Sequence, residues 1–493
     1  MTIATIDAAH CAPDPSNPSD PRRPATIHPQ FIWKLGMPET ALYDIYEHDV
    51  RSPHERQHRS QTADGPADSA AAGTEPALTT TAKLTPREKK WIIYDVGNSA
   101  FVLLSTAVIP IYAKSLMPAD GNIVSAWGYA QTIASLVIAL LMPLLGSIAD
   151  VQGMKIKFFL GFFGTGVVTC CAMALPLTWL PFLVVYILAT IGLNGSLTFY
   201  DSMLIDTTPN ERMDKVSSHG YGWGYIGSTV PFIVCIALIF GGPALPFGWT
   251  TTGCTRASFI ITAVWWVAFT IPLISSYRQE HYRATRDQLG TAVRGTFREL
   301  GGTFRKIVRN KPLWMFMLAF FFYIDAVNTV ISMSTSYGAE LGIDSTQLVV
   351  ALLVTQFVAF PCAILYGRMA GRFGCKAMIV AAVVAYMCIV FFAAFFLVSA
   401  AQFWILAILV GMFQGGIQAL SRSYYGKIIP KDHANEYYGF YDIFGKTASI
   451  LGTFLVATTT SITGNASLGV LSIAILLVLA LIFLLLQKDP TQA

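Results

Sequence analysis

Two short stretches, far apart in the chain, decide the expected fold. Residues 146–155 read GSIADVQGMK and residues 367–376 read GRMAGRFGCK, so two glycines and the final lysine recur at an offset of 221 residues. The same offset relates Pro209 to Pro430. Self-similarity at a fixed spacing indicates that the chain contains two copies of one structural unit.

Each stretch follows a long apolar run, and such runs recur through most of the chain. The 493 residues are 54% hydrophobic and only 13% charged, which is about half the charged fraction of a typical soluble protein. A run of about 20 residues can cross the ~30 Å hydrocarbon layer as a helix, because a helix satisfies its own backbone hydrogen bonds. We therefore predict an all-α membrane protein with twelve transmembrane helices, at residues 91–113, 124–145, 158–177, 180–200, 219–240, 257–275, 313–336, 347–366, 377–399, 402–420, 438–461 and 467–487.

The loops between these spans differ sharply in basic residues. The even-numbered loops carry nineteen Lys and Arg, Arg422 among them, whereas the odd-numbered loops carry only Lys114 and Arg256. Basic loops stay on the cytoplasmic side of a membrane. Both termini and all even-numbered loops are therefore predicted to be cytoplasmic. A missed span would invert the charge pattern of every later loop, so the regular alternation supports a count of twelve.

The spans and the repeat divide the chain into four regions. Residues 1–85 contain ten prolines, five of the eight histidines and no long apolar run, which predicts a disordered cytoplasmic tail. Residues 86–276 and 313–488 are expected to form two parallel six-helix bundles, related by an axis along the membrane normal. Residues 277–312 are a basic cytoplasmic linker whose apolar residues recur near helical spacing. They predict an amphipathic surface helix, with a flexible linker as the alternative.

Several motifs add a family resemblance. Two six-helix halves with G-x-x-x-D-x-x-G-x-K between the second and third helices resemble the major facilitator superfamily. Residues 94–101 (YDVGNSAF), 323–329 (YIDAVNT) and 415–423 (GGIQALSRS) resemble the branch that contains the vacuolar amino-acid effluxers linked to autophagy and their uncharacterised bacterial relatives. The resemblance covers about residues 90–487. It implies a secondary transporter of a small polar solute working by alternating access, with amino acids as first candidates and protons as candidate coupling ion.

Polar residues inside the spans are the candidates for substrate binding or proton coupling, because each is costly in a bilayer. Asp325 is expected near mid-bilayer with Asn328 and Thr329 on the same helix face; the alternative is a structural hydrogen bond between helices. Asp95 repeats this pattern at a shallower depth, where helix capping or an interfacial hydrogen bond is an equal alternative. The candidate set is Tyr323, Asp325, Asn328, Thr329, Asp95, Asn98, Gln414 and Gln418, and weaker cavity candidates are Asn194, Tyr200, Asp201, Tyr221 and Trp223.

The repeated stretches are expected to act in gating, as the resemblance implies. Gly146 and Gly153 permit tight turning and close helix approach, and Asp150 should face the N-terminus of a neighbouring helix. Lys155 is expected to anchor the cytoplasmic face. Gly371 replaces the acid in the second copy, so that contact should be weaker. The gating set is Gly146, Asp150, Gly153, Lys155, Gly367, Arg372, Gly374 and Lys376, while Asp442 and Lys446 have the i,i+4 spacing of an ion pair.

Other classes of function find less support. The chain has no G-x-x-x-x-G-K-[ST] loop, so ATP drive is not expected, and no cofactor, metal or nucleic-acid partner is predicted. His219, His281 and His433 lack ligand-like spacing. The open alternatives to a solute transporter are a lipid scramblase or non-transporting receptor on the same fold, and an intramembrane lipid-modifying enzyme. The cell membrane is the expected location, with a vacuolar or lysosomal membrane as the alternative.

Overall fold

The computed structural model describes residues 83–118, 123–244, 250–283, 300–340, 345–397, 399–448 and 450–491. The chain divides into two units, Met1–Pro76 and Ala77–Ala493, and all described residues belong to the second. The predicted tail therefore lies outside the described residues except for 83–85. The middle of the predicted linker, residues 284–299, also lies outside them, and residues 300–309 are helical.

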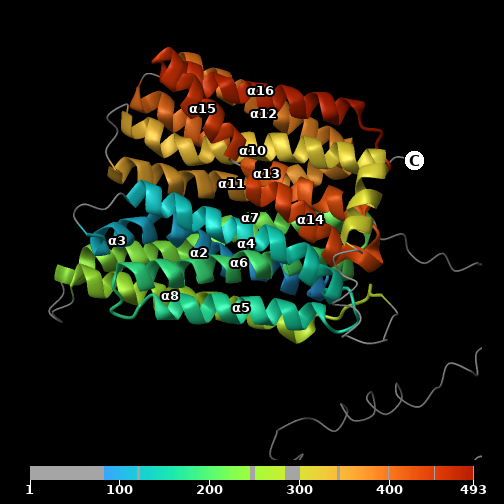
Figure 1. The fold of residues 1–493 in the computed structure, drawn as a ribbon, viewed down its shortest axis with the longest axis horizontal. Coiled ribbons are helices and arrows are strands. Elements are labelled where there is room, and N and C mark those ends of the chain that lie inside the picture. Colours follow the sequence, from blue (N-terminus) through green and yellow to red (C-terminus); the bar gives the residue numbers. More distant parts are fainter. Residues whose placement is uncertain are drawn as a thin grey trace, which may run out of the picture. The chain divides into compact units, whose positions relative to one another are not determined.

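The described residues of the second unit fold almost entirely into helices, which run alongside one another in two groups (Figure 1). The first half, blue to green, and the second half, yellow to red, each contribute one group. The first half contains α2 (Pro86–Ala107), α3 (Ile109–Leu116), α4 (Ile123–Ala149), α5 (Lys155–Ala172), α6 (Trp179–Thr207), α7 (Asn210–Gly241) and α8 (Thr251–Ser276). The second contains α10 (Lys311–Glu340), α11 (Ser345–Phe373), α12 (Cys375–Phe396), α13 (Ala400–Ile428), α14 (Ala434–Thr447), α15 (Ile450–Thr463) and α16 (Ala466–Leu486).

The helix lengths agree with a multi-pass membrane protein. Ten helices among the described residues are long and apolar enough to cross a bilayer, and α2 with α3 makes an eleventh if their 46° bend lies within one span. At the predicted eleventh span, α14 and α15 follow each other with 14 residues each. Every predicted span thus falls on one helix or on two consecutive helices, which is consistent with twelve spans.

Many outward-facing side chains are large and apolar. Leu140 is 69% exposed, Leu180 67% and Phe240 79%. A water-soluble monomer rarely leaves so much apolar surface uncovered. The chain is therefore an integral membrane protein whose helices are covered by lipid.

Local sequence explains where several helices begin and turn. Thr85 and Glu88 form a capping box at the start of α2, each side chain accepting a hydrogen bond from the other residue's backbone N–H. The repeated stretches turn at Gly153 (φ 73°) and Gly374 (φ 90°), a conformation that other residues adopt only with strain. The equivalent glycines therefore make equivalent turns, as expected for Gly153.

The two halves touch most closely at one end of the helices. The turns at residues 150–155 and 429–433 and the segment 278–283 lie there, and we call it the basic end. A Cβ added to Gly146 would lie 2.5 Å from the carbonyl oxygen of Asn435, and one added to Gly367 would lie 2.5 Å from the Cβ of Ser218. Both glycines of the repeat therefore permit close contact between the halves.

Several helices extend further at the basic end than the predicted spans. The tenth helix continues to Ile428, so Arg422 lies inside α13 instead of in a loop, and α7 begins at Asn210, so it contains Arg212. Both side chains are buried, and Arg212 pairs with Glu88 at 2.7 Å. Buried charges paired across helices interrupt the apolar run that marks a span, so the predicted helices stop too early.

Candidate functional site

A buried ion cluster around Arg422 joins the two halves near the basic end. The guanidinium donates to Asp201 Oδ1 at 2.9 Å, to Asp95 Oδ2 at 3.4 Å, and to the side chain and carbonyl of Ser217 at 3.0 and 3.1 Å. Arg422 is only 2% exposed, and all of these partners belong to the first half. A buried charge persists only where it is paired in this way, so the cluster requires the halves to be together.

Aromatic rings complete the surroundings of this cation. The Arg422 guanidinium lies 4.3 Å from the ring centre of Tyr221, 4.8 Å from Trp91 and 5.5 Å from Tyr200. Such contacts stabilise a desolvated cation by about 2 kcal/mol. The Tyr200 hydroxyl also donates to Asp95 at 2.8 Å. Ring faces and carboxylates thus hold the guanidinium in one position.

The cluster follows the symmetry of the repeat. Asp201 and Arg422 are separated by 221 residues, the repeat offset, so two equivalent positions meet each other. In an arrangement with twofold pseudosymmetry, two equivalent positions contact each other only near the symmetry axis. Ser202 donates to Asn435, and its equivalent Ser423 donates to Asp214 at 2.7 Å, the equivalent of Asn435. The two halves therefore match residue by residue at this interface.

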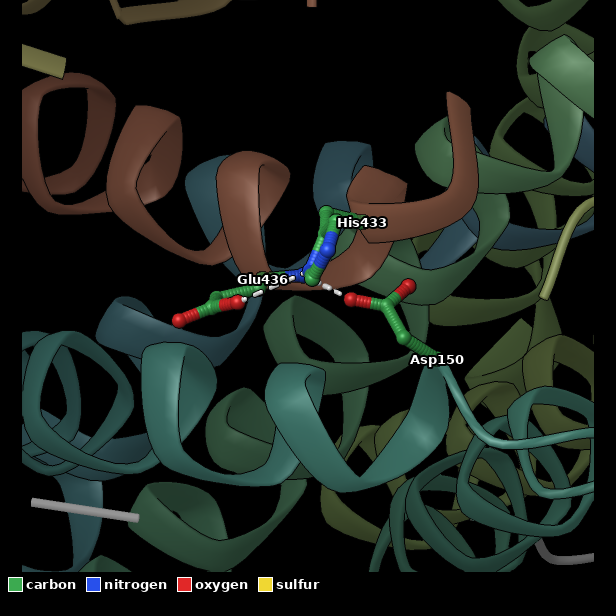
Figure 2. A group of neighbouring side chains, drawn as sticks. All are labelled: Asp150, His433 and Glu436. Atoms are coloured by element: carbon green, nitrogen blue, oxygen red, sulfur yellow. Dashed lines mark hydrogen bonds and ion pairs between the residues drawn. The ribbon is translucent and has the colours of Figure 1, made fainter. Parts of the chain in front are cut away.

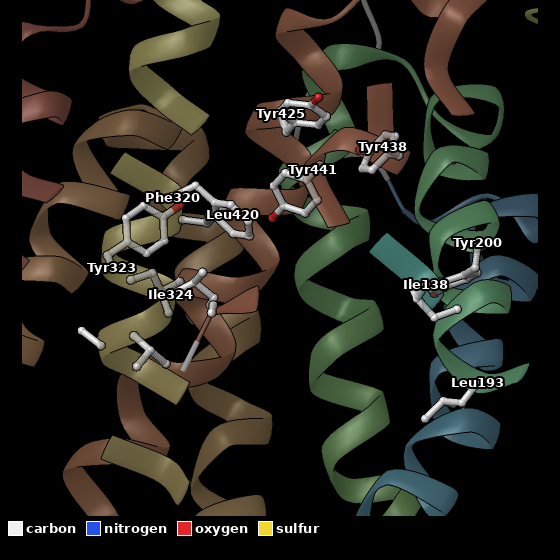
Figure 3. Close-up of a cluster of buried hydrophobic side chains, with 14 of the residues drawn as sticks. Ile138, Leu193, Tyr200, Phe320, Tyr323, Ile324, Leu420, Tyr425, Tyr438 and Tyr441 are labelled. Atoms are coloured by element: carbon white, nitrogen blue, oxygen red, sulfur yellow. The ribbon is translucent and has the colours of Figure 1, made fainter. Parts of the chain in front are cut away.

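Packed rings support the second half beside the cluster. Tyr441 stacks on Phe320 with ring centres 4.1 Å apart and on Tyr425 at 4.7 Å. The Tyr438 hydroxyl donates to the carbonyl of Arg422 at 2.9 Å. Figure 3 shows these tyrosines grouped between the helices, with Tyr200 of the first half beyond them. This packing fixes α13 and α14 relative to each other.

A second contact between the halves is made by Asp150. Its Oδ1 accepts from the backbone N–H and the side-chain amide of Asn435 at 2.9 and 2.7 Å, and its Oδ2 accepts from the N–H of Glu436 at 3.1 Å. The expected contact with a helix N-terminus is therefore present, at the start of α14 (Figure 2). Burial raises the pKa of Asp150 to about 7, although Lys155 and the N–H donors act in the opposite direction.

Lys155 is buried and does not anchor the cytoplasmic face, contrary to expectation. Its ammonium is fully buried 2.7 Å from Asp206 Oδ2, inside the first half. Lys376, the equivalent lysine, donates to the carbonyl of Gln487. Arg372 is exposed. A buried carboxylate attracts the lysine more strongly than the membrane surface, and sequence spacing alone does not reveal that carboxylate.

In the first copy of the gating stretch the acid lies on the stretch itself, whereas at the equivalent contact of the second copy it lies on the residue that faces the stretch. Gly371 stands where Asp150 stands in the first copy, whereas Asp214 stands where Asn435 stands. Asp214 accepts from Lys427 at 2.6 Å as well as from Ser423. Each of these two equivalent contacts thus contains a buried aspartate, and both aspartates belong to the first half.

Asp325 is fully buried and bonded within the second half. It accepts from the backbone N–H groups of Leu451 and Gly452 at 3.2 and 2.7 Å and from the Thr329 hydroxyl at 3.3 Å. It therefore caps the start of α15, which agrees with the structural alternative for this residue. Asn328, on the same helix, is half-buried.

Three of the remaining candidates have defined hydrogen-bond partners. The Tyr323 hydroxyl lies 2.6 Å from that of Ser421, and Asn98 donates to Asp95 at 3.3 Å. Gln418 accepts from Tyr225 of the first half at 3.0 Å, so this glutamine bonds a neighbouring helix. Gln414 is buried.

The predicted ion pair between Asp442 and Lys446 is not formed. Asp442 accepts from Thr198 of the first half, and the salt bridges among the described residues do not include Lys446. Lys446 is half-buried and turns towards a cavity. The i,i+4 spacing is correct, but a contact from the other half holds the acid.

That cavity opens between the halves, away from the basic end. Its volume is about 1220 Å³, enough for a small solute with water. The first half contributes α3 and α4, and the second contributes α10, α14 and α15. The lining residues are Pro110, Ile111, Lys114, Trp127, Gly128, Gln131, Thr132, Ser135, Leu136, Ser332, Met333, Lys446, Thr447, Ala448, Ile450, Thr453, Phe454 and Ala457.

Comparisons with known proteins agree with this architecture. Residues 118–489 match the family model described as vacuole effluxer Atg22 like. The chain belongs to the Atg22-like family. An MFS-type transporter of Bacillus subtilis, YxiO, described as uncharacterized, is 44% identical over 83% of this chain and 96% of its own length. Autophagy-related protein 22-1 of Aspergillus niger is 23% identical, and the Atg22-like chain spans about half of that relative's length.

Solved structures show the same fold. The human organic anion transporter MFSD10 superposes with a TM-score of 0.64 at 13% identity, over 82% of this chain and all of the other. The transporter FucP in its outward conformation gives 0.61 at 14% identity, over 82% of this chain and 99% of the other. The family match and the 44% identity to the MFS-type transporter of Bacillus subtilis make the Atg22-like chain a membrane transporter of the major facilitator type.

The structure thus groups the sequence candidates differently from expectation. Asp95 and Asn98 join Tyr200, Asp201 and Tyr221 around Arg422, whereas Tyr323 and Asp325 bond within the second half. Sequence reasoning counted Arg422 as a cytoplasmic loop residue and missed its role. One signal was available, because the repeat offset of 221 pairs Arg422 with an acid, Asp201.

Proposed function

We propose that this protein is a secondary active transporter that moves a small polar solute by alternating access, with amino acids as first candidate solutes and protons as coupling ion. One observation carries the proposal. Buried polar contacts close the halves together at the basic end, while a cavity of about 1220 Å³ separates them towards the opposite end. Two matched bundles can expose a central site to either side by rocking.

The contacts at the basic end are suited to break and re-form. The Arg422 cluster and the Asp150 contact both join the first half to the second. Rocking that opens the basic end separates these groups and lets water hydrate them. The interface would then exchange protein hydrogen bonds for water hydrogen bonds, which keeps the free-energy difference between the two states small.

The cavity chemistry supports a zwitterionic or carboxylate-bearing solute. Lys446 offers an ammonium that forms no salt bridge among the described residues, and Gln131 and Ser135 offer neutral polar groups. Trp127 and Phe454 add apolar surface. A solute whose carboxylate binds the Lys446 ammonium, and whose apolar side chain packs against the Trp127 and Phe454 rings, would fit both the polar and the apolar lining of the cavity.

Proton coupling is assigned to buried carboxylates that the transport cycle exposes. Asp95 and Asp201 contact Arg422 from the opposite half, so opening of the basic end changes their surroundings directly. Asp325 is the second candidate, since it caps α15 at the break in the predicted eleventh span. A helix break beside a carboxylate offers a place where proton binding and helix movement affect each other.

The basic end is proposed to face the cytoplasm, with both termini on that side. The excess of Lys and Arg in the loops of this end supports the orientation. We place the protein in the cell membrane, and the vacuole named in the family description is the alternative.

The test is transport by purified protein in liposomes. Labelled amino acids should accumulate when a pH gradient is imposed, and the variants Asp95→Asn and Asp201→Asn should lose the dependence on that gradient. If Asp325→Asn leaves gradient-driven flux unchanged, Asp325 has no coupling role. Scrambling of labelled lipids without any solute flux would replace the proposal by a scramblase on the same fold.

A further inference from the structure

Three ionisable side chains converge where the two halves meet at the basic end. Asp150 follows α4 of the first half, whereas His433 and Glu436 lie at the start of α14 in the second. One possible ligand atom from each residue lies within 4.8 Å of the others. Figure 2 shows the three side chains grouped at this helix start. None of the contacts described for Arg422 includes them.

The cluster contains two buried carboxylates, and one of their oxygens lacks a hydrogen-bond partner among the described residues. Asp150 is 1% exposed and Glu436 2%. Glu436 Oε1 has no hydrogen-bond partner in the part of the chain that the structure describes, and Glu436 Oε2 lies 3.5 Å from His433 Nδ1. The nearby ammonium of Lys155 is held by Asp206. An unpaired buried carboxylate oxygen costs free energy unless a cation or donor reaches it.

We propose that Asp150, His433 and Glu436 bind one divalent transition-metal ion. One imidazole nitrogen and two carboxylate oxygens form a ligand set that suits Zn²⁺ or Mn²⁺, with water completing the shell. The three groups lie close enough for small side-chain rotations to bring them onto one ion. His433 has 28% of its side chain exposed, so an ion reaches the site from solvent at the basic end.

The ion would act on the transport cycle because its ligands come from both halves. Opening of the basic end moves Asp150 away from His433 and Glu436, which breaks the site. Binding to only one of two states favours that state by mass action. The bound ion therefore holds the basic end closed and slows the return of the cavity to that side, whichever solute is carried.

The test uses the full-length protein in detergent or nanodiscs after removal of metal by EDTA. Zn²⁺ and Mn²⁺ are titrated by calorimetry, and the thermal midpoint of unfolding is measured with and without each ion. We expect saturable binding and a midpoint raised by several degrees. His433→Gln should weaken binding by at least about tenfold, since loss of a supporting ligand partner alone costs that much.

Two further variants keep the result interpretable. Glu436→Gln retains the side-chain shape and should also weaken binding, whereas His219→Gln, outside the cluster, should not. Residues 1–85 contain five of the eight histidines, and histidines outside the cluster also bind metal ions. Binding at the cluster is therefore measured as the difference in metal binding between the parent protein and His433→Gln. Equal binding by these two proteins would overturn the proposal. A second result would also overturn the proposal. In that case neither ion binds, acidification in EDTA stabilises the parent protein, and His433→Gln removes this stabilisation. The cluster would then bind a proton instead of a metal ion.

Discussion

Replacement of Arg422 by glutamine should shift the protein from a closed to an open basic end. The change leaves Asp95 and Asp201 buried without their cation and removes the ring contacts of Trp91 and Tyr221. Loss of one partner of a buried ion pair costs about 3–5 kcal/mol. The open state hydrates both carboxylates and avoids this cost. The equilibrium should therefore move towards the open state by a factor of about a hundred to a few thousand.

Cysteine labelling measures this shift. Ser218 is fully buried at the interface, and its hydroxyl has no hydrogen-bond partner among the residues that the structure describes, so Ser218→Cys perturbs little. Because the chain has eight cysteines of its own, the substitution is made in a background in which all eight are replaced by serine. A membrane-impermeant maleimide added at the basic end should then label the introduced thiol much faster when Arg422 is replaced by glutamine.

Two controls separate the ion cluster from a general charge effect. Arg372→Gln removes the same charge from an exposed position at the same end and should leave labelling unchanged. Addition of Asp201→Asn to Arg422→Gln removes one unpaired acid and should slow labelling again. If Arg422→Gln labels no faster than its parent, the cluster does not hold the basic end closed.

Three further predictions use the same reasoning. The pKa of Asp150 is about 7 in the closed state and returns towards about 4 in water, so protonation of Asp150 favours the closed state. The rate of maleimide labelling in EDTA, divided by the rate for unfolded protein, should therefore increase as the pH rises towards 7. Asp150→Asn should flatten this pH dependence. Lys446→Gln should raise KM for a carboxylate-bearing solute about tenfold or more, through loss of a charged hydrogen bond, with an unchanged thermal midpoint. Gly146→Ala would place a Cβ against the Asn435 carbonyl and should favour the open state by about 1–3 kcal/mol in the labelling assay, whereas Gly161→Ala, in open space, should not.

The fold was predictable because apolar runs and an internal repeat are properties of sequence alone. The 221-residue offset even contains the pairing of Asp201 with Arg422. The partners of individual charges were not predictable, since they come from elements far apart in the chain. Asp325 bonds the start of a helix 126 residues later, and no local spacing encodes that contact.

The errors have the same origin. Asp442 and Lys446 have the spacing of an ion pair, but Thr198 of the other half binds the acid. His433 lies three residues from Glu436, whereas Asp150, the third member of their cluster, is 285 residues from Asn435 of the same turn. Contacts between the halves decide the chemistry of both sites.

The meeting of Asp201 with Arg422 bears on how such a chain arose. In a dimer of two identical six-helix subunits, a residue beside the symmetry axis faces its own copy, so an acid would face an acid. Opposite charges at that place require two positions that mutate independently. This salt bridge is therefore younger than the gene fusion that joined the subunits, and it is an interaction that no homodimeric ancestor could have formed.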